Sequence, residues 1–98
     1  MQQSAYAIAR AGGRHAGLLR TYERKSTAEI QRALRSYERQ VELHQQKIHS
    51  PEQFVEAWRT LRSHAQSGLL RHWQEDMVRN QALAEITRGL LRERGVEL

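Results

Sequence analysis

Residues 26–50 have the sequence STAEIQRALRSYERQVELHQQKIHS, and this stretch decides the fold. Its first four residues match a capping box, in which a Ser hydroxyl and a Glu carboxylate satisfy backbone N–H groups at a helix start. Mostly apolar side chains then recur every three or four residues, the period of one helix face. They are Ile30, Leu34, Tyr37, Val41, His44 and Ile48. The pattern predicts a long helix over residues 27–49.

The sequence after this helix contains two more start signals. Ser50 and Pro51 are an N-cap residue and a first-turn proline, which predicts a shorter helix over residues 51–61. Ser63 is a candidate cap for a last helix over residues 64–94, which Gly95 would end. The last helix carries a broad apolar stripe, so we expect it to pack antiparallel to the helix at 27–49. Trp58 and Trp73 are expected to pack between helices.

The sequence before residue 26 predicts short elements. A helix over residues 5–11 would end at the Gly12-Gly13 pair, and residues 14–22 would form a short helix or turn. Strand-like alternation occurs nowhere. We therefore expect an all-α fold, a small helical bundle of two long antiparallel helices with shorter N-terminal and connecting helices. A length of 98 residues leaves room for a single domain over residues 1–98.

The charge balance points to an anionic partner. The chain has 16 Lys+Arg against 11 Asp+Glu, a net charge of +5, and all the cationic residues except Lys25 and Lys47 are Arg. Arg presents a planar fork of donors that fits phosphate and carboxylate, so nucleic acid or an acidic protein is favoured. The alternative is codon bias together with Glu–Arg surface pairs. No apolar run approaches the roughly 20 residues of a membrane-spanning helix, and the lack of cysteine excludes disulfides and thiolate chemistry.

Histidines dominate the reactive side chains. His15 follows Gly12-Gly13-Arg14, where a glycine-rich turn either approaches a phosphate or acts as a plain hinge. His44 lies in the apolar stripe, with Lys47 three residues later. If the first segment folds back on the long helix, these residues would meet. Metal-independent RNA cleavage needs such a set, with one base, one acid and a fixed cation. The alternative for His44 is an ordinary core histidine with a hydrogen-bond partner.

Two further features leave alternatives open. His72 and Asp76 are spaced to contact each other on one helix, either as a surface pair or as part of a metal site that would need ligands from elsewhere. Tyr22 lies in a polar setting, where its hydroxyl would contact a phosphate or simply pack. Sequence motifs for zinc proteases, nucleotide-binding loops and serine nucleophiles are absent.

Several segments form a pattern together with the single residues Tyr22, Ser26, Ile30, His44 and Trp58. The segments are GGRHAGLL (12–19), SYERQ (36–40), KIHSP (47–51) and QSGLLRHWQED (66–76). The pattern covers about residues 10–95 and resembles the C-terminal toxin tips of bacterial polymorphic toxins, the contact-dependent growth inhibition and Rhs-type effectors. The resemblance implies a module at the end of a larger secreted effector, delivered to the target-cell cytoplasm and neutralised at home by a cognate immunity protein. Many such tips are nucleases that act on tRNA.

We therefore expect an antibacterial toxin domain that is a metal-independent, tRNA-cleaving ribonuclease without a cofactor. His15 and His44 would be acid and base, and Arg14 and Lys47 would steady the phosphate. The RNA would be bound by Arg20, Tyr22, Arg32, Arg35 and Arg39. An immunity protein that masks this surface should be acidic, and a host translation factor is a further candidate partner.

Two alternatives to this function stay open. One is a non-enzymatic basic helical module that binds nucleic acid or an acidic protein. The other is a metal-dependent DNase toxin that uses His72 and Asp76.

Overall fold

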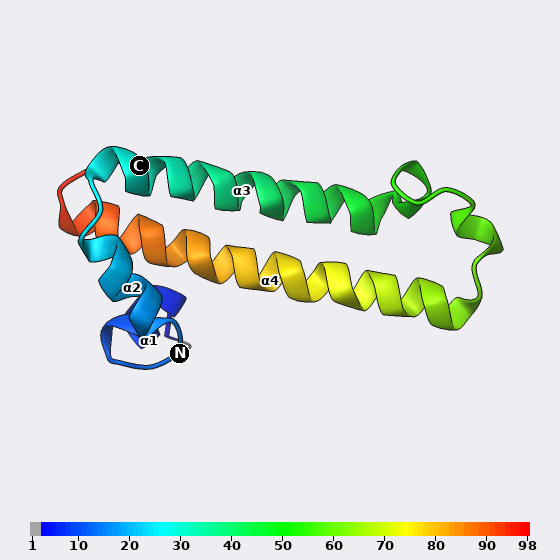
Figure 1. Cartoon of the computed structure of the whole chain (residues 1–98), viewed down its shortest axis with the longest axis horizontal. Helices are drawn as coiled ribbons and strands as arrows, with labels where there is room; N and C mark the ends of the chain where they lie inside the picture. Colours follow the sequence, from blue (N-terminus) through cyan, green and yellow to red (C-terminus); the bar gives the residue numbers. More distant parts are fainter. Residues whose placement is uncertain (1–2) are drawn as a thin grey trace.

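The computed structural model describes residues 3–98, and all regular structure in that range is helical. The elements are α1 (Ala5–Arg10), α2 (Ala16–Glu23), α3 (Thr27–His49), the 3-10 helices η1 (Pro51–Gln53) and η2 (Trp58–Thr60), and α4 (Ser63–Glu93). Figure 1 shows α3 and α4 lying side by side and antiparallel, with α1 and α2 at one end of the pair. Residues 50–62, which we call the connector, lie at the other end. The predicted all-α bundle with two long helices is confirmed.

Local signals explain where α3 begins. Ser26 has extended backbone, its Oγ accepts a hydrogen bond from the Glu29 N–H at 3.1 Å, and the same Oγ donates to Glu29 Oε1 at 3.2 Å. This is the capping box that the sequence predicts. At α4 the prediction is wrong by one residue, because Arg62 occupies the cap position and Ser63 is already the first helical residue.

The predicted helix over residues 51–61 is wrong. Only η1 and η2 form there, and between them Ala57 has φ 57°, a left-handed conformation that ends any right-handed helix. The connector instead folds onto α4. The Trp58 and Trp73 rings stack with centroids 6.0 Å apart, and Gln66 Nε2 donates to the Trp58 carbonyl at 2.8 Å.

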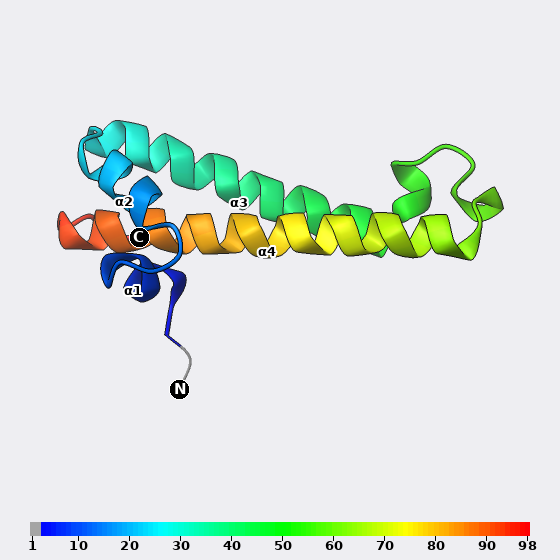
Figure 2. The same ribbon diagram turned by 60° about the horizontal axis from the view of Figure 1, so that its bottom comes forward.

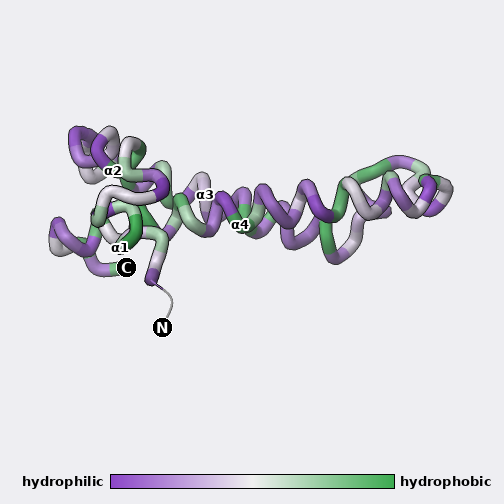
Figure 3. Tube along the Cα trace, turned by 90° about the horizontal axis from the view of Figure 1, so that it is seen from below, coloured by the Kyte–Doolittle hydropathy of each residue, from purple (hydrophilic) through white to green (hydrophobic). Residues whose placement is uncertain are grey.

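The apolar core lies at the end of the molecule opposite the connector. One cluster joins Ala9 and Leu19 to Ile86 and Leu90 of α4, and a second joins Ile30 and Leu34 of α3 to Ala84 and Leu91 of α4. Both clusters use the last third of α4, so α1, α2 and the start of α3 wrap one end of that helix (Figure 2). Figure 3 shows many hydrophilic residues along the rest of the helix pair.

The molecule is therefore long and thin. Its principal extents are 49 × 26 × 23 Å and its radius of gyration is 16.3 Å, whereas a compact domain of 100 residues has a radius of about 13 Å. Within residues 3–98, no helix is both long enough and apolar enough to cross a bilayer.

Candidate functional site

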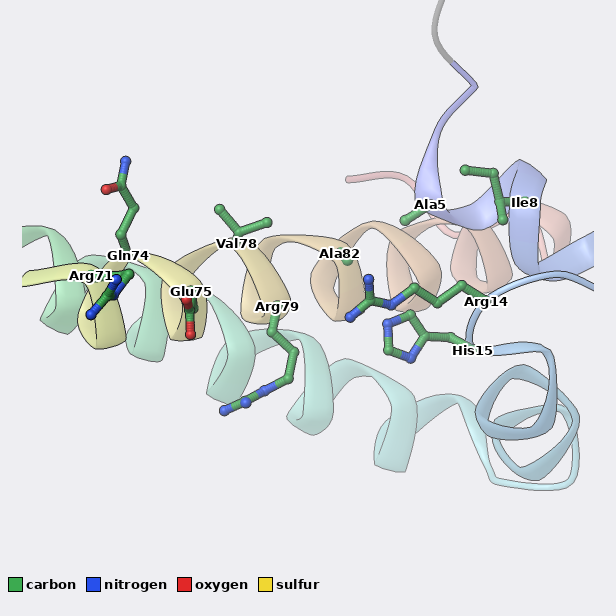
Figure 4. Close-up of a pocket in the computed structure, with 10 residues that line it drawn as sticks. All are labelled: Ala5, Ile8, Arg14, His15, Arg71, Gln74, Glu75, Val78, Arg79 and Ala82. Atoms are coloured by element: carbon green, nitrogen blue, oxygen red, sulfur yellow. The ribbon is translucent and has the colours of Figure 1, made fainter. Parts of the chain in front are cut away.

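A groove of about 840 Å³ lies between α4 and the N-terminal segment, and we call it the α1–α4 groove. It is lined by Ala5 and Ile8 of α1, by Arg14 and His15 of the following turn, and by Arg71, Gln74, Glu75, Val78, Arg79 and Ala82 of α4. Figure 4 shows the Arg14 and His15 side chains next to each other, beside α4 at the level of Ala82. Two predicted site residues therefore lie together in a groove.

The Gly12-Gly13 turn directs these two side chains into the groove. Gly12 has φ 93°, a conformation that favours glycine. A Cβ on Gly13 would lie 2.8 Å from Ile8 Cγ2 and 3.0 Å from the Ile8 carbonyl oxygen, so only glycine fits against α1 here. His15 itself has φ 68° at the N-cap of α2. The turn is thus structural, and it also presents Arg14 and His15 to α4.

The groove carries more positive than negative charge. Its charged side chains are those of Arg14, Arg71, Arg79 and Glu75, apart from the ionisable ring of His15. In the described part of the chain, no carboxylate lies within ion-pair distance of Arg14 or Arg71. Arg79 Nη2 lies 3.0 Å from Asp76 Oδ1. Exposed guanidinium groups without carboxylate partners are available to an anionic ligand.

His44 lies in a different environment from His15. It is 7% exposed, between α3 and α4. Its Nδ1 donates to the Gln40 carbonyl at 2.6 Å, because a carbonyl oxygen can only accept, and its Nε2 lies 3.6 Å from Asp76 Oδ2. His44 is therefore a core histidine with a hydrogen-bond partner, which is the alternative that the sequence analysis left open for it.

Asp76 contacts both His44 and a residue that lines the groove. Besides His44, its carboxylate contacts His72 Nε2 at 3.2 Å and Arg79 Nη2 at 3.0 Å. We call these four residues the Asp76 cluster. The predicted contact between His72 and Asp76 is present, and Arg79 is the member of the cluster that also lines the groove. No group of three or more His, Cys, Asp or Glu side chains among residues 3–98 is arranged to hold a metal ion.

The structure does not bring the four predicted catalytic residues into one site. Arg14 and His15 line the groove, whereas His44 belongs to the Asp76 cluster and Lys47 Nζ lies 5.9 Å from the centre of the Trp73 ring. The reason is topological. The N-terminal segment folds back on the core end of α4, as Figure 1 shows, and the second half of α3 runs away from it.

The predicted RNA-binding residues lie outside the groove. The side chains of Arg20, Arg32, Arg35 and Arg39 are exposed on α2 and α3. Tyr22 packs instead of facing solvent, and its hydroxyl lies 2.7 Å from that of Tyr37. Burial raises the pKa of Tyr37, and the hydrogen bond with Tyr22 raises it further. This hydroxyl pair fastens α2 to α3.

The contribution of α4 to the groove is not predicted from the sequence. Arg71, Glu75, Val78, Arg79 and Ala82 follow the three- and four-residue spacing of one helix face. That spacing is visible in the sequence, but nothing local shows that α1 packs beside this face. Comparison with protein-family models, with curated proteins and with solved structures found no match to this chain.

Proposed function

We propose that this chain is a ribonuclease domain of the antibacterial toxin type, which holds an RNA phosphate in the α1–α4 groove and uses His15 as its acid–base group. One observation carries the proposal: Arg14 and His15 lie next to each other in a groove that contains two further arginines. The resemblance to toxin tips gives the biological setting, with tRNA as the substrate, delivery into a target cell, and an acidic immunity protein that covers the groove.

The chemistry needs no metal ion. The His15 ring takes the proton from a ribose 2′-OH, the 2′-oxygen attacks the adjacent phosphorus, and the bond from phosphorus to the 5′-oxygen breaks. The leaving 5′-oxygen takes a proton from water or from the protonated ring. The products are a 2′,3′-cyclic phosphate and a 5′-hydroxyl. Arg14 stabilises the charge that develops on the non-bridging oxygens. A single acid–base group contributes about 10²- to 10⁴-fold.

A second candidate is a module that binds RNA without cleaving it. The observation that favours it is that the other candidate acid–base groups, His44 and Glu75, lie away from His15. His44 is outside the groove, and Glu75 lies seven residues from Ala82 on α4, about 10 Å along the helix. Among the residues that line the groove, none therefore places a second acid–base side chain beside His15.

The test is incubation of the whole chain with bulk tRNA in EDTA. We expect fragments that end in a 2′,3′-cyclic phosphate. His15→Asn should lower cleavage at least 100-fold while RNA binding and helical content stay unchanged. Asn is the suitable replacement because it tolerates a positive φ. The matched control is His64→Asn, an exposed histidine at the start of α4, which should cleave like the parent chain.

Three outcomes separate the candidates. Binding without cleavage by the parent chain supports the non-enzymatic module. Full cleavage by His15→Asn shows that the site is wrong. For the toxin role, the chain should arrest growth when it is produced in a bacterial cytoplasm, whereas the His15→Asn variant should not.

A further inference from the structure

Besides its cations, the α1–α4 groove is lined by aliphatic side chains, and we call these side chains its apolar floor. Ile8 and Ala5 supply it from α1, and Val78 and Ala82 supply it from α4. Val78 is 55% exposed, although most large hydrophobic side chains of this domain are at least partly buried. Figure 4 shows it standing out from α4 between Gln74 and Ala82. A lone exposed valine needs no explanation, but one that lines a cationic groove together with other aliphatic side chains offers a contact to a ligand.

The cations are spaced along the groove and not gathered at one point. Arg71 and Arg79 are eight residues apart on α4, which is about 12 Å along the helix. Arg14 reaches the same groove at the level of Ala82 (Figure 4). Successive nucleotides of a stacked strand rise by about 3.4 Å, so these guanidinium groups are too far apart to hold one phosphate. They suit the phosphates of a segment several nucleotides long.

The apolar floor and the cations together should favour single-stranded RNA over an RNA duplex. In an A-form duplex the bases are paired and stacked inside, and the phosphates face outward. A duplex in the groove would therefore meet the arginines but would place ribose and phosphate over the apolar floor, which stays without an apolar partner. A single strand can turn one base out of its stack and lay it on that floor while its flanking phosphates reach the arginines.

We propose that the α1–α4 groove selects unpaired RNA, with one unstacked base against Val78 and Ala82 and with phosphates on either side of it at Arg14 and Arg71. This inference rests on the proposed function, because it names the form of the substrate bound at the same groove. The floor contains no aromatic ring and offers only aliphatic contact, so we expect little preference among the four bases.

The test measures binding separately from cleavage. The probe is a fluorescently labelled 12-nucleotide RNA, alone or annealed to its complement, and the protein is the full chain carrying His15→Asn so that the probe stays intact. Fluorescence anisotropy should show the single strand bound at least tenfold more tightly than the duplex. Val78→Asn should weaken single-strand binding about 5- to 10-fold, the value of losing an apolar contact of this size, and leave duplex binding unchanged.

Two controls define the interpretation. Leu98→Asn makes the same kind of change at an exposed apolar residue outside the groove lining and should leave both affinities unchanged. Arg71→Gln should weaken both forms and lower the salt dependence of binding by about one unit of slope.

The outcomes distinguish this inference from the function on which it rests. Equal or tighter binding of the duplex overturns the selection for unpaired RNA, as does a Val78→Asn variant that binds the single strand normally. Either result leaves the ribonuclease intact if RNA is still cleaved in EDTA in a His15-dependent manner. Failure to bind either RNA form removes both proposals.

Discussion

His15 and Ala57 have φ values of 68° and 57°, and they are the non-glycine residues of the described chain in the left-handed region. This conformation costs a residue with a Cβ about 1–2 kcal/mol. Strain of this kind gathers at functional sites. At His15 the strained backbone belongs to a residue whose side chain lines a cationic groove. Ala57 lies in the connector and does not line that groove.

Ala57→Gly should therefore stabilise the protein. Glycine removes the penalty of the left-handed conformation, but it loses more backbone entropy on folding than alanine does, which offsets part of the gain. We therefore expect the free energy of unfolding to rise by about 1 kcal/mol, with RNA cleavage unchanged. Urea denaturation followed by circular dichroism measures the first and the tRNA assay the second. A variant with lower stability would mean that the connector does not keep this backbone conformation in solution.

His44→Leu should preserve function. The side chain is buried next to Asp76 and outside the groove, and a leucine suits the apolar stripe of α3 better than an imidazole. Asp76 keeps His72 and Arg79 as partners. We expect cleavage within about twofold of the parent rate, since the loss of a group that does not contact substrate removes no transition-state interaction. A large loss of cleavage at an unchanged melting temperature would bring His44 back into the mechanism.

At the scale of elements, α1 is held on α4 by a very close approach. A Cβ on Gly89 of α4 would lie 2.2 Å from Tyr6 Cδ2 and 2.3 Å from Tyr6 Cγ. Arg10 of α1 also pairs with Glu23 and Glu93, and Glu85 accepts a hydrogen bond from the Ala5 N–H at 2.7 Å. Since α1 is one wall of the groove, its docking should affect the RNA binding that we propose for that groove.

Gly89→Ala should displace α1. The new methyl overlaps the Tyr6 ring, which must move away from α4, so we expect a loss of about 1–3 kcal/mol in unfolding free energy together with weaker RNA binding. Gly68→Ala is the matched control, because a Cβ there meets nothing within 4 Å in the same helix. It should raise stability by about 0.5–1 kcal/mol. Melting curves and RNA titrations of both variants test this, and equal behaviour of the two would contradict the close contact.

The same scale shows what could be predicted from the sequence. The helix boundaries at Ser26 and at Gly12-Gly13 follow from capping and turn chemistry, which act within a few residues. The connector helix was predicted wrongly because the left-handed break falls on an alanine, which carries no local signal for it. Local signals also predict half of the site, because Arg14 and His15 adjoin the Gly12-Gly13 turn. The α4 side of the groove could not be predicted, because long-range packing determines which face of α4 contacts α1.

At the scale of the whole molecule, stability is unevenly distributed. The apolar clusters lie where α1, α2 and the start of α3 surround residues 84–91. Beyond them His44 of α3 contacts Asp76 of α4, and the Trp58–Trp73 stack closes the far end. Local opening is easiest where few buried apolar contacts oppose it, so the connector half should open before the core half.

Hydrogen exchange tests this distribution. Amides of residues 84–91 in α4 should exchange only through global unfolding, and those of residues 66–76 in the same helix should exchange at least tenfold faster. Uniform protection along α4 would show that the helix pair unfolds as one unit. The groove borders both halves of α4, so a bound single strand should slow exchange at residues 71–79 most of all.

The antiparallel pairing also fixes where the described ends of the polypeptide lie. Because α1 and the last turn of α4 share the core end (Figure 1), a short flexible linker could join the two ends, and the loop at residues 54–57 could be opened to make new ones. Such a circular permutant would keep the helix packing and the groove intact while moving its attachment point to the opposite tip of the rod. It would therefore leave the groove accessible when the domain is tethered to a support.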